Sequence, residues 1–160
     1  MRKARSCRNK PSRDLAEEKI VVRELTLRDY SPAFALWSRS KGMGLSGADS
    51  RPAIAAYLRR NPGLSLIARR GTEVVATVLC DHDGRRGFLH HLAVARPYRG
   101  QGLGAKLVST CLARLASDGI EKCHIFLHAD NPEGRKFWSR VGWKVREDLI
   151  VISNDTRTSS

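Results

Sequence analysis

The feature that most constrains the fold is an apolar segment, residues 88–94, that leads through a proline and a glycine-rich turn into a helix-forming segment. The turn reads RGQGLG over residues 99–104, and apolar residues then recur at helical spacing from Leu103 to Leu115. The first N–H groups of a helix have no intrahelical partner and carry partial positive charge. A strand, a glycine turn and a helix in this order therefore predict a binding site for a phosphate or pyrophosphate group.

The spacing of the glycines separates the phosphate-binding motifs. Gly100, Gly102 and Gly104 do not match the dinucleotide fingerprint, which needs two residues before its third glycine, and no Lys-Ser or Lys-Thr pair follows as in a P-loop. The pattern that fits is Arg/Gln-x-x-Gly-x-Gly/Ala, with Arg99 at its first position. Preceded by Leu-Ala-Val at residues 92–94, it closely resembles the acetyl-CoA signature of the GNAT superfamily of N-acetyltransferases.

A second segment supports this resemblance. Asn131 opens a predicted helix that contains Phe137 and Trp138, and Gly142-Trp143 follows, which is similar to the closing motif of the family. The resemblance implies an α/β (α+β) fold with a mixed, mostly antiparallel sheet covered by helices, in which the central strands splay apart. The expected strands cover residues 19–26, 64–70, 74–82, 88–94, 122–128 and 143–153, and the expected helices begin near residues 26, 50, 102 and 131.

Length and composition suit one domain, with 160 residues of which 41% are hydrophobic and 28% charged. Residues 1–18 lack periodicity and are predicted to form a disordered basic tail, so the single acetyltransferase domain is expected in residues 19–160. The net charge of +13 is spread along the chain without interleaved aromatic residues, which argues against nucleic acid as a partner.

No apolar run approaches the roughly 20 residues that cross a bilayer, so no membrane association is expected. The four cysteines form no CxxC pair, which indicates neither a disulfide framework nor a metal site. These features predict a cytoplasmic protein without a metal cofactor. A homodimer is compatible with the sequence.

The resemblance implies that acetyl-CoA is the co-substrate. The backbone of Leu92 and Val94 would pair with the pantetheine arm as an added strand would, often at a β-bulge. The Val94 N–H would also stabilise the oxyanion of the tetrahedral intermediate. Asn131 would contact the coenzyme, with a helix cap as the alternative. The coenzyme-binding residues predicted in this way are Leu92, Ala93, Val94, Arg99, Gly100, Gln101, Gly102, Leu103, Gly104, Ala105 and Asn131.

Direct attack requires an amine that has lost its proton, and the ordinary amine pKa is about 8 for an α-amine and about 10.4 for a lysine. The strand that ends at Val94 contains no carboxylate but has His90 and His91, which strand alternation would direct to opposite faces. His90 shares parity with Leu92 and Val94, so His90 is the candidate base and Val94 the candidate oxyanion donor. A structural His90, with water relaying the proton, is the alternative.

Trp138 stands where many members of the family have a tyrosine that acts as general acid. An indole donates a hydrogen bond but no proton at neutral pH, so this role does not transfer. Tyr98 and Cys123 are possible substitutes. Because the leaving thiol has an ordinary pKa of about 8.5, unassisted departure of the thiolate is the simpler account.

These features predict an acetyl-CoA-dependent N-acetyltransferase that uses direct attack by a primary amine, from a small molecule or a protein N-terminus. The alternative is a non-catalytic acyl-CoA-binding or regulatory module that kept the glycine turn, since the usual tyrosine and carboxylate are missing.

Overall fold

The computed structural model describes residues 18–156. The chain divides into two compact units, Met1–Ile125 and Phe126–Ser160. The first contains a sheet with three helices, and the second contains one helix with its connecting segments. The predicted tail, residues 1–18, falls outside the described residues except for Glu18. Within residues 18–156, no helix combines the length and the apolarity needed to cross a membrane.

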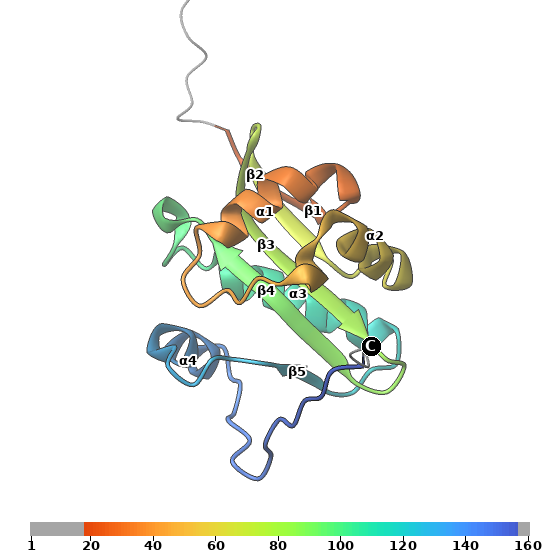
Figure 1. Ribbon diagram of the computed structural model, residues 1–160. Helices are drawn as coiled ribbons and strands as arrows, with labels where there is room; N and C mark the ends of the chain where they lie inside the picture. Colours follow the sequence, from red (N-terminus) through yellow and green to blue (C-terminus); the bar gives the residue numbers. More distant parts are fainter. Residues whose placement is uncertain (1–17, 157–160) are drawn as a thin grey trace, which may run out of the picture. The chain divides into compact units, whose positions relative to one another are not determined.

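The sheet has five strands in the spatial order β1-β2-β3-β4-β5. Strands β1 to β4 pair antiparallel, whereas β4 and β5 pair parallel. A parallel pair needs a crossover, which the helix α3 provides (Figure 1). The predicted mixed, mostly antiparallel sheet is therefore confirmed. The strands are β1 (Ile20–Glu24), β2 (Leu66–Arg70), β3 (Glu73–His82), β4 (Gly87–Val94) and β5 (Cys123–Ile125).

Helices cover both faces of this sheet (Figure 1). The helix α1 (Tyr30–Ser38) lies on one face and α3 (Leu103–Ser117) on the other, while α2 (Arg51–Arg60) follows α1 in the chain. Thr26 and Asp29 form a capping box on the 3-10 turn η1 (Leu27–Asp29), which leads into α1 close to the helix start expected near residue 26. Two further 3-10 turns are η2 (Gly47–Asp49) and η3 (Arg96–Tyr98).

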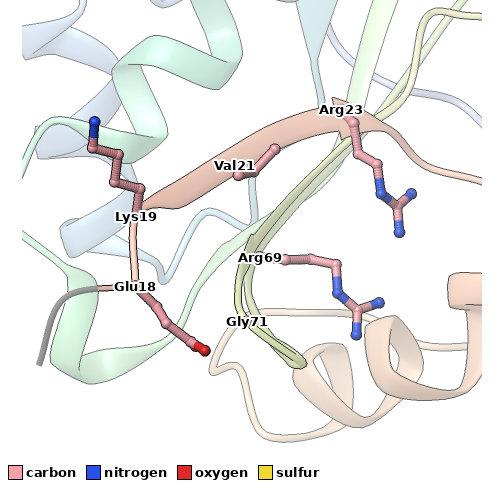
Figure 2. A pocket seen from close by; sticks show the side chains of 6 residues that line it. All are labelled: Glu18, Lys19, Val21, Arg23, Arg69 and Gly71. Atoms are coloured by element: carbon pink, nitrogen blue, oxygen red, sulfur yellow. The ribbon is translucent and has the colours of Figure 1, made fainter. Parts of the chain in front are cut away.

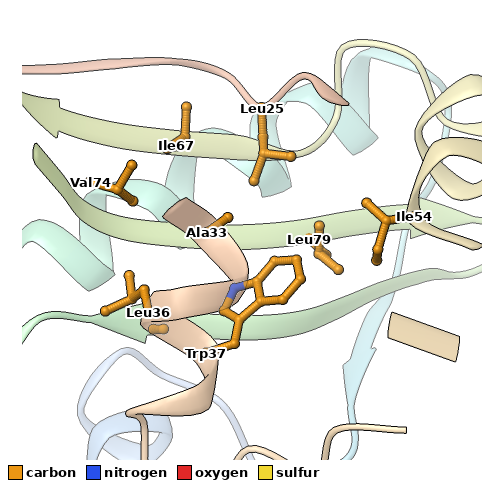
Figure 3. Packing of buried hydrophobic residues seen from close by; sticks show 9 residues of the cluster. Leu25, Ala33, Leu36, Trp37, Ile54, Ile67, Val74 and Leu79 are labelled. Atoms are coloured by element: carbon orange, nitrogen blue, oxygen red, sulfur yellow. The ribbon is translucent and has the colours of Figure 1, made fainter. Parts of the chain in front are cut away.

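The core between α1 and the sheet centres on Trp37, whose exposed fraction is 1%. Leu36 from α1, Ile54 from α2 and Leu79 from β3 belong to the same buried cluster (Figure 3). Odd-numbered residues in the middle of β3 face this cluster, whereas Cys80 faces α3, where it contacts Cys111. The β3 strand thus carries apolar side chains on both faces, because helices cover both.

Two predicted strands differ from the structure. The strand expected at residues 122–128 is only three residues long, because its pairing with β4 ends at Leu89 and Ile125. The final strand expected at residues 143–153 is wrong, since the described chain forms no strand there. Its apolar residues Leu149 and Ile152 are exposed, and residues 143–153 pair with no strand of the described chain.

Candidate functional site

A β-bulge interrupts β4 next to the predicted site. Leu79 of β3 pairs with His90, but Thr77 pairs with Ala93, so two steps along β3 match three along β4. The extra residue lies at His91–Leu92. His91 has φ +50° and is the one non-glycine residue with a left-handed backbone in the described part of the chain. Such a residue costs of order 1–3 kcal/mol unless its surroundings hold it. The bulge expected from the family resemblance is confirmed.

The bulge places both histidines on the same face of the sheet. His90 lies against Asp81, with Nε2 3.2 Å from Oδ2, and His91 lies against Asp49, with Nε2 2.6 Å from Oδ1. The prediction that they point to opposite faces is wrong, because strand alternation assumes a regular pleat and the extra residue breaks it. The same extra residue affects Val94. His90 pairs with Leu79 and Ala93 pairs with Thr77, so the side chains of His90 and Ala93 lie on one face of the sheet, and that of Val94 lies on the other.

His90 is partly open to solvent, with 34% of its side chain exposed. Its ring stacks on Phe88 of β4, with centroids 6.4 Å apart, and meets the Tyr57 ring of α2 edge-on at 6.5 Å. The buried Tyr57 Oη makes no hydrogen bond within the described residues. Burial and the charge of Asp81 both raise the pKa of Tyr57, with burial the larger cause. His90 therefore lies beside a carboxylate and two aromatic rings, yet remains reachable.

His91 is less exposed and packs against the core. Only 14% of its side chain is exposed, and its ring packs edge-on against Trp37, with centroids 4.8 Å apart. Burial lowers the pKa of His91, although the hydrogen bond to Asp49 acts in the opposite direction. Asp49 also accepts the Ser46 N–H at 2.8 Å. The His91–Asp49 pair thus joins the segment before α2 to the bulge.

The edge of β4 that faces β5 is open beyond Leu89. Pairing with β5 ends at Leu89–Ile125, and no strand of the described chain pairs with that edge from His90 to Val94. The Ala95 N–H donates to Val75 O of the neighbouring strand β3 at 2.8 Å. In an antiparallel pair, successive residues direct their backbone N–H and C=O groups to alternate sides of the strand, so those of Val94 point away from β3, to the open edge. The β4–β5 pairing thus covers only Gly87 to Leu89 of β4 and ends where the resemblance implies that the central strands splay apart.

The glycine turn follows directly. Gly100 has φ +73° and Gly102 φ +79°, and a Cβ at either position would meet no atom within 4 Å. Both positions thus favour glycine for its backbone freedom and leave space above the turn. Lys106 N–H donates to Gly102 O at 3.0 Å, which leaves the N–H groups of residues 103–105 without an acceptor inside the helix. The turn has the geometry expected of an anion site.

Side chains fix the turn to the sheet. Arg99 Nε donates to Val94 O at 2.9 Å, and Gln101 Nε2 donates to Pro97 O at 3.0 Å. The buried Tyr98 donates from Oη to Glu73 Oε2 at 2.8 Å. Tyr98 therefore anchors η3 to β3, which disfavours it as a substitute acid. Burial raises the pKa of Cys123 to about 12, so this thiol is a weaker acid than the one it would protonate.

The second unit contains Asn131 at the start of α4 (Pro132–Arg140). Its Oδ1 accepts the Gly134 N–H at 2.8 Å, which is the helix cap considered as the alternative role. The Trp138 ring packs against Phe137 at 5.1 Å and Trp143 at 4.7 Å between centroids. These three rings give this unit its own aromatic contacts.

A cavity of about 460 Å³ lies at the β1 edge of the sheet (Figure 2). None of the predicted site residues lines it, and two of its cations, Arg23 and Arg69, bind Asp29 at 2.6 and 3.1 Å. The described residues contain no group of three His, Cys, Asp or Glu side chains placed to hold a metal ion. The lining residues are Glu18, Lys19, Val21, Arg23, Arg69 and Gly71.

Sequence reasoning missed the partners of the two histidines. Asp81 could have been found, since a hairpin that turns at residues 83–87 brings the end of one strand beside the start of the next. Asp49 and Thr77 gave no such signal, because their contacts to His91 depend on long-range packing.

Comparisons with known proteins identify the family of this chain. A family model described as "Acetyltransferase (GNAT) family" matches residues 23–143. N-alpha-acetyltransferase 30 of Schizosaccharomyces pombe is 26% identical over 92 residues, which cover 54% of this chain and 61% of that protein. The matched part is therefore less than two thirds of that relative's length.

Solved structures share the fold. Ard1 from Thermoplasma volcanium has a TM-score of 0.70 at 16% identity, with 79% of this chain and 84% of that chain covered. The PaiA N-acetyltransferase from Thermoplasma acidophilum, determined in complex with coenzyme A, has a TM-score of 0.70 at 18% identity, with 81% and 92% covered.

Proposed function

Since this chain belongs to the acetyltransferase (GNAT) family, we propose that it moves an acetyl group from acetyl-CoA to a primary amine by direct attack. The observation that carries this proposal is that the part of β4 left unpaired by β5 is followed directly in the chain by the glycine turn that starts α3. Calorimetric titration with acetyl-CoA, CoA and ADP tests it, and absence of acetyl-CoA binding would contradict it. Binding justifies a screen of small amines and N-terminal peptides for acetylation.

The coenzyme would lie along this path. Its pyrophosphate would accept hydrogen bonds from the N–H groups of residues 103–105, with Arg99 beside them. Arg99 uses Nε on Val94 O, and its guanidinium has further N–H donors for a phosphate. The pantetheine arm would pair with the backbone of residues 92–94 at the edge that β5 leaves open. Asn131 stays a proposed contact, because its observed bond is the helix cap.

The chemistry needs one hydrogen-bond donor and one proton acceptor. The amine nitrogen attacks the thioester carbon, the C–N bond forms, and the oxygen gains charge that the Val94 N–H would stabilise. The C–S bond then breaks, and CoA leaves as thiolate. The proton released by the amine passes to a base.

His90 is the better placed of the two histidines for that role, because His91 is buried against Trp37 and bound to Asp49. His90 pairs with Leu79 and Val94 pairs with Ala76, which are three residues apart on β3. The backbones of His90 and Val94 are therefore about 10 Å apart. An amine at the Val94 N–H would therefore reach His90 through water. This arrangement combines the candidate base with the water relay considered as its alternative.

Replacing His90 with alanine is expected to lower kcat by about 10²–10⁴-fold with an accepted amine. The pH–rate profile of the variant should differ from that of the wild-type protein, because the proposed proton acceptor is missing. Acetyl-CoA affinity should stay at the wild-type value, because the proposed contacts with the pantetheine arm come from the backbone of residues 92–94, which the substitution does not change. A variant with the wild-type pH profile would assign His90 a structural role.

Replacing Trp138 with phenylalanine is expected to leave kcat nearly unchanged, because the indole has no proton to give and the thiolate leaves unassisted. Phenylalanine can keep an aromatic contact with Trp143, and thermal unfolding would show that the variant stays folded. If kcat fell by several orders of magnitude in the folded variant, Trp138 would have a role in the chemistry.

The acceptor is a protein N-terminus or a small amine. The name of the Schizosaccharomyces pombe relative, an N-alpha-acetyltransferase, favours a protein N-terminus. The screen separates the two classes, since N-terminal peptides and small amines are assayed side by side. A cytoplasmic location and a homodimer stay predictions.

A further inference from the structure

A buried hydrogen-bonded chain ends on the strained residue of the bulge. The Trp37 indole N–H of α1 donates to Thr77 Oγ1 of β3 at 2.8 Å. Thr77 Oγ1 in turn donates to the backbone carbonyl oxygen of His91 at 3.2 Å. Thr77 has no exposed surface and Trp37 has 1%. One hydroxyl group therefore joins α1, β3 and the bulge inside the core.

The side chain of His91 is held separately. Its Nε2 lies 2.6 Å from Asp49 Oδ1, and Asp49 is fixed by Ser46 N–H and by Tyr30 Oη, which donates to Asp49 O at 2.8 Å. His91 is thus bound at its carbonyl and at its ring. Two independent contacts on the one non-glycine residue with positive φ in the described chain are what a strained backbone needs to persist.

We propose that the Trp37–Thr77–His91 chain is a positioning device for the coenzyme, which holds the β4 bulge and thereby sets which backbone groups face the open edge. Thr77 is the positioning residue at its centre. This inference rests on the proposed function, because it assigns the open edge to the pantetheine arm. Neither Thr77 nor Trp37 touches the coenzyme in this proposal.

The reason lies in the register. The bulge shifts β4 by one residue against β3, so that Val94 rather than its neighbour directs its N–H to the open edge. Loss of the bulge would move the pairing by one residue and turn that N–H toward β3. A contact that holds His91 in its left-handed conformation therefore controls the binding surface from within the core.

A pair of variants isolates the hydroxyl group. Thr77→Val keeps the shape of the side chain but removes the hydroxyl, which leaves the Trp37 N–H and the His91 carbonyl without this partner. Thr77→Ser keeps the hydroxyl and loses a methyl group. Calorimetric titration with acetyl-CoA should show affinity weakened by about tenfold or more in Thr77→Val and close to wild type in Thr77→Ser.

Ser65 supplies the matched control. It is also buried, with an exposed fraction of 1%, and its hydroxyl accepts the Cys80 N–H of β3 at 3.1 Å from the segment that leads into β2, not from β4. Ser65→Ala should lower the melting temperature but leave acetyl-CoA affinity unchanged. Thr77→Val with wild-type affinity would overturn the proposal, and so would an equal loss in Ser65→Ala, which would indicate general destabilisation.

Two further measurements keep the test decisive. If Thr77→Val does not fold, Asp49→Asn weakens the other contact of His91 without a change in size and is expected to lower the affinity in the same direction. A crystal structure of either variant reads φ at residue 91 directly, and an unchanged bulge would overturn the proposal. Wild-type protein that binds no acetyl-CoA would instead contradict the proposed function, which separates the two failures.

Discussion

Replacing Gly102 with valine is expected to weaken acetyl-CoA binding by at least about 100-fold, equal to about 2.7 kcal/mol, while the chain stays folded. Gly102 has φ +79°, a conformation that a β-branched residue rarely adopts, and it forms the N-cap of α3. A Cβ there would meet no protein atom within 4 Å, so the added side chain would occupy the space proposed for the pyrophosphate. Calorimetric titration measures the loss.

Gly119, at the other end of α3, gives the matched control. It has φ +78° and equally open surroundings, so valine there carries the same backbone strain without approaching the turn. Gly119→Val should lose stability but keep acetyl-CoA affinity. Unchanged affinity in Gly102→Val, or equal losses in both variants, would refute the assignment of the turn to the pyrophosphate.

Replacing Asp29 with alanine is expected to lower the free energy of unfolding by about 3–5 kcal/mol. Asp29 is 2% exposed and binds Arg23 at 2.6 Å and Arg69 at 3.1 Å. Its Oδ2 also accepts the Thr26 N–H at 3.0 Å, which starts η1. The variant would leave two cations beside the β1–β2 pair and an uncapped turn, and urea denaturation would measure the cost.

The exposed pair Arg146–Asp148 is the control for charge alone. Asp148→Ala should change the free energy of unfolding by less than about 1 kcal/mol, because solvent screens an exposed pair. A loss in Asp29→Ala as small as that in Asp148→Ala would show that Asp29 does not hold the β1–β2 region.

The same residue gives the stability a pH dependence. The hydrogen bond from Arg23 is the main reason why the pKa of Asp29 lies well below its ordinary value. A lowered pKa in the folded state stabilises the protein above the unfolded value of about 3.9, and this contribution is lost as the pH falls below it. Asp29→Asn should therefore lose less stability than wild type between neutral and strongly acidic pH.

Sequence reasoning worked best where the structure is local. The strand, turn and helix around Gly102, the helix start near residue 26 and the hairpin from β3 to β4 all depend on residues close in the chain. The family resemblance added the bulge in β4. It did not give the consequence of the bulge. An extra residue reverses the face of the sheet to which each later side chain of the strand points.

The wrong predictions concern features that depend on contacts between residues far apart in the sequence. The His90–His91 alternation failed because φ at His91 is set by contacts with Thr77 and Asp49, which are distant in the sequence. The apolar run at residues 149–152 predicted a strand from composition, but a strand exists only where a neighbour pairs with it. The composition of a segment shows whether it can form a strand, but a neighbouring strand must pair with it for the strand to form.

The contact from Arg99 Nε to Val94 O has a consequence for ligand selection. One side chain joins the end of β4 to the start of the glycine turn, so the spacing between the proposed thioester and pyrophosphate positions is fixed. The proposed site would then select ligands by their length as well as by their charge. ADP could occupy the turn without reaching the strand, and a short thioester could reach the strand without the turn. Only a ligand as long as the whole coenzyme would gain from both ends at once.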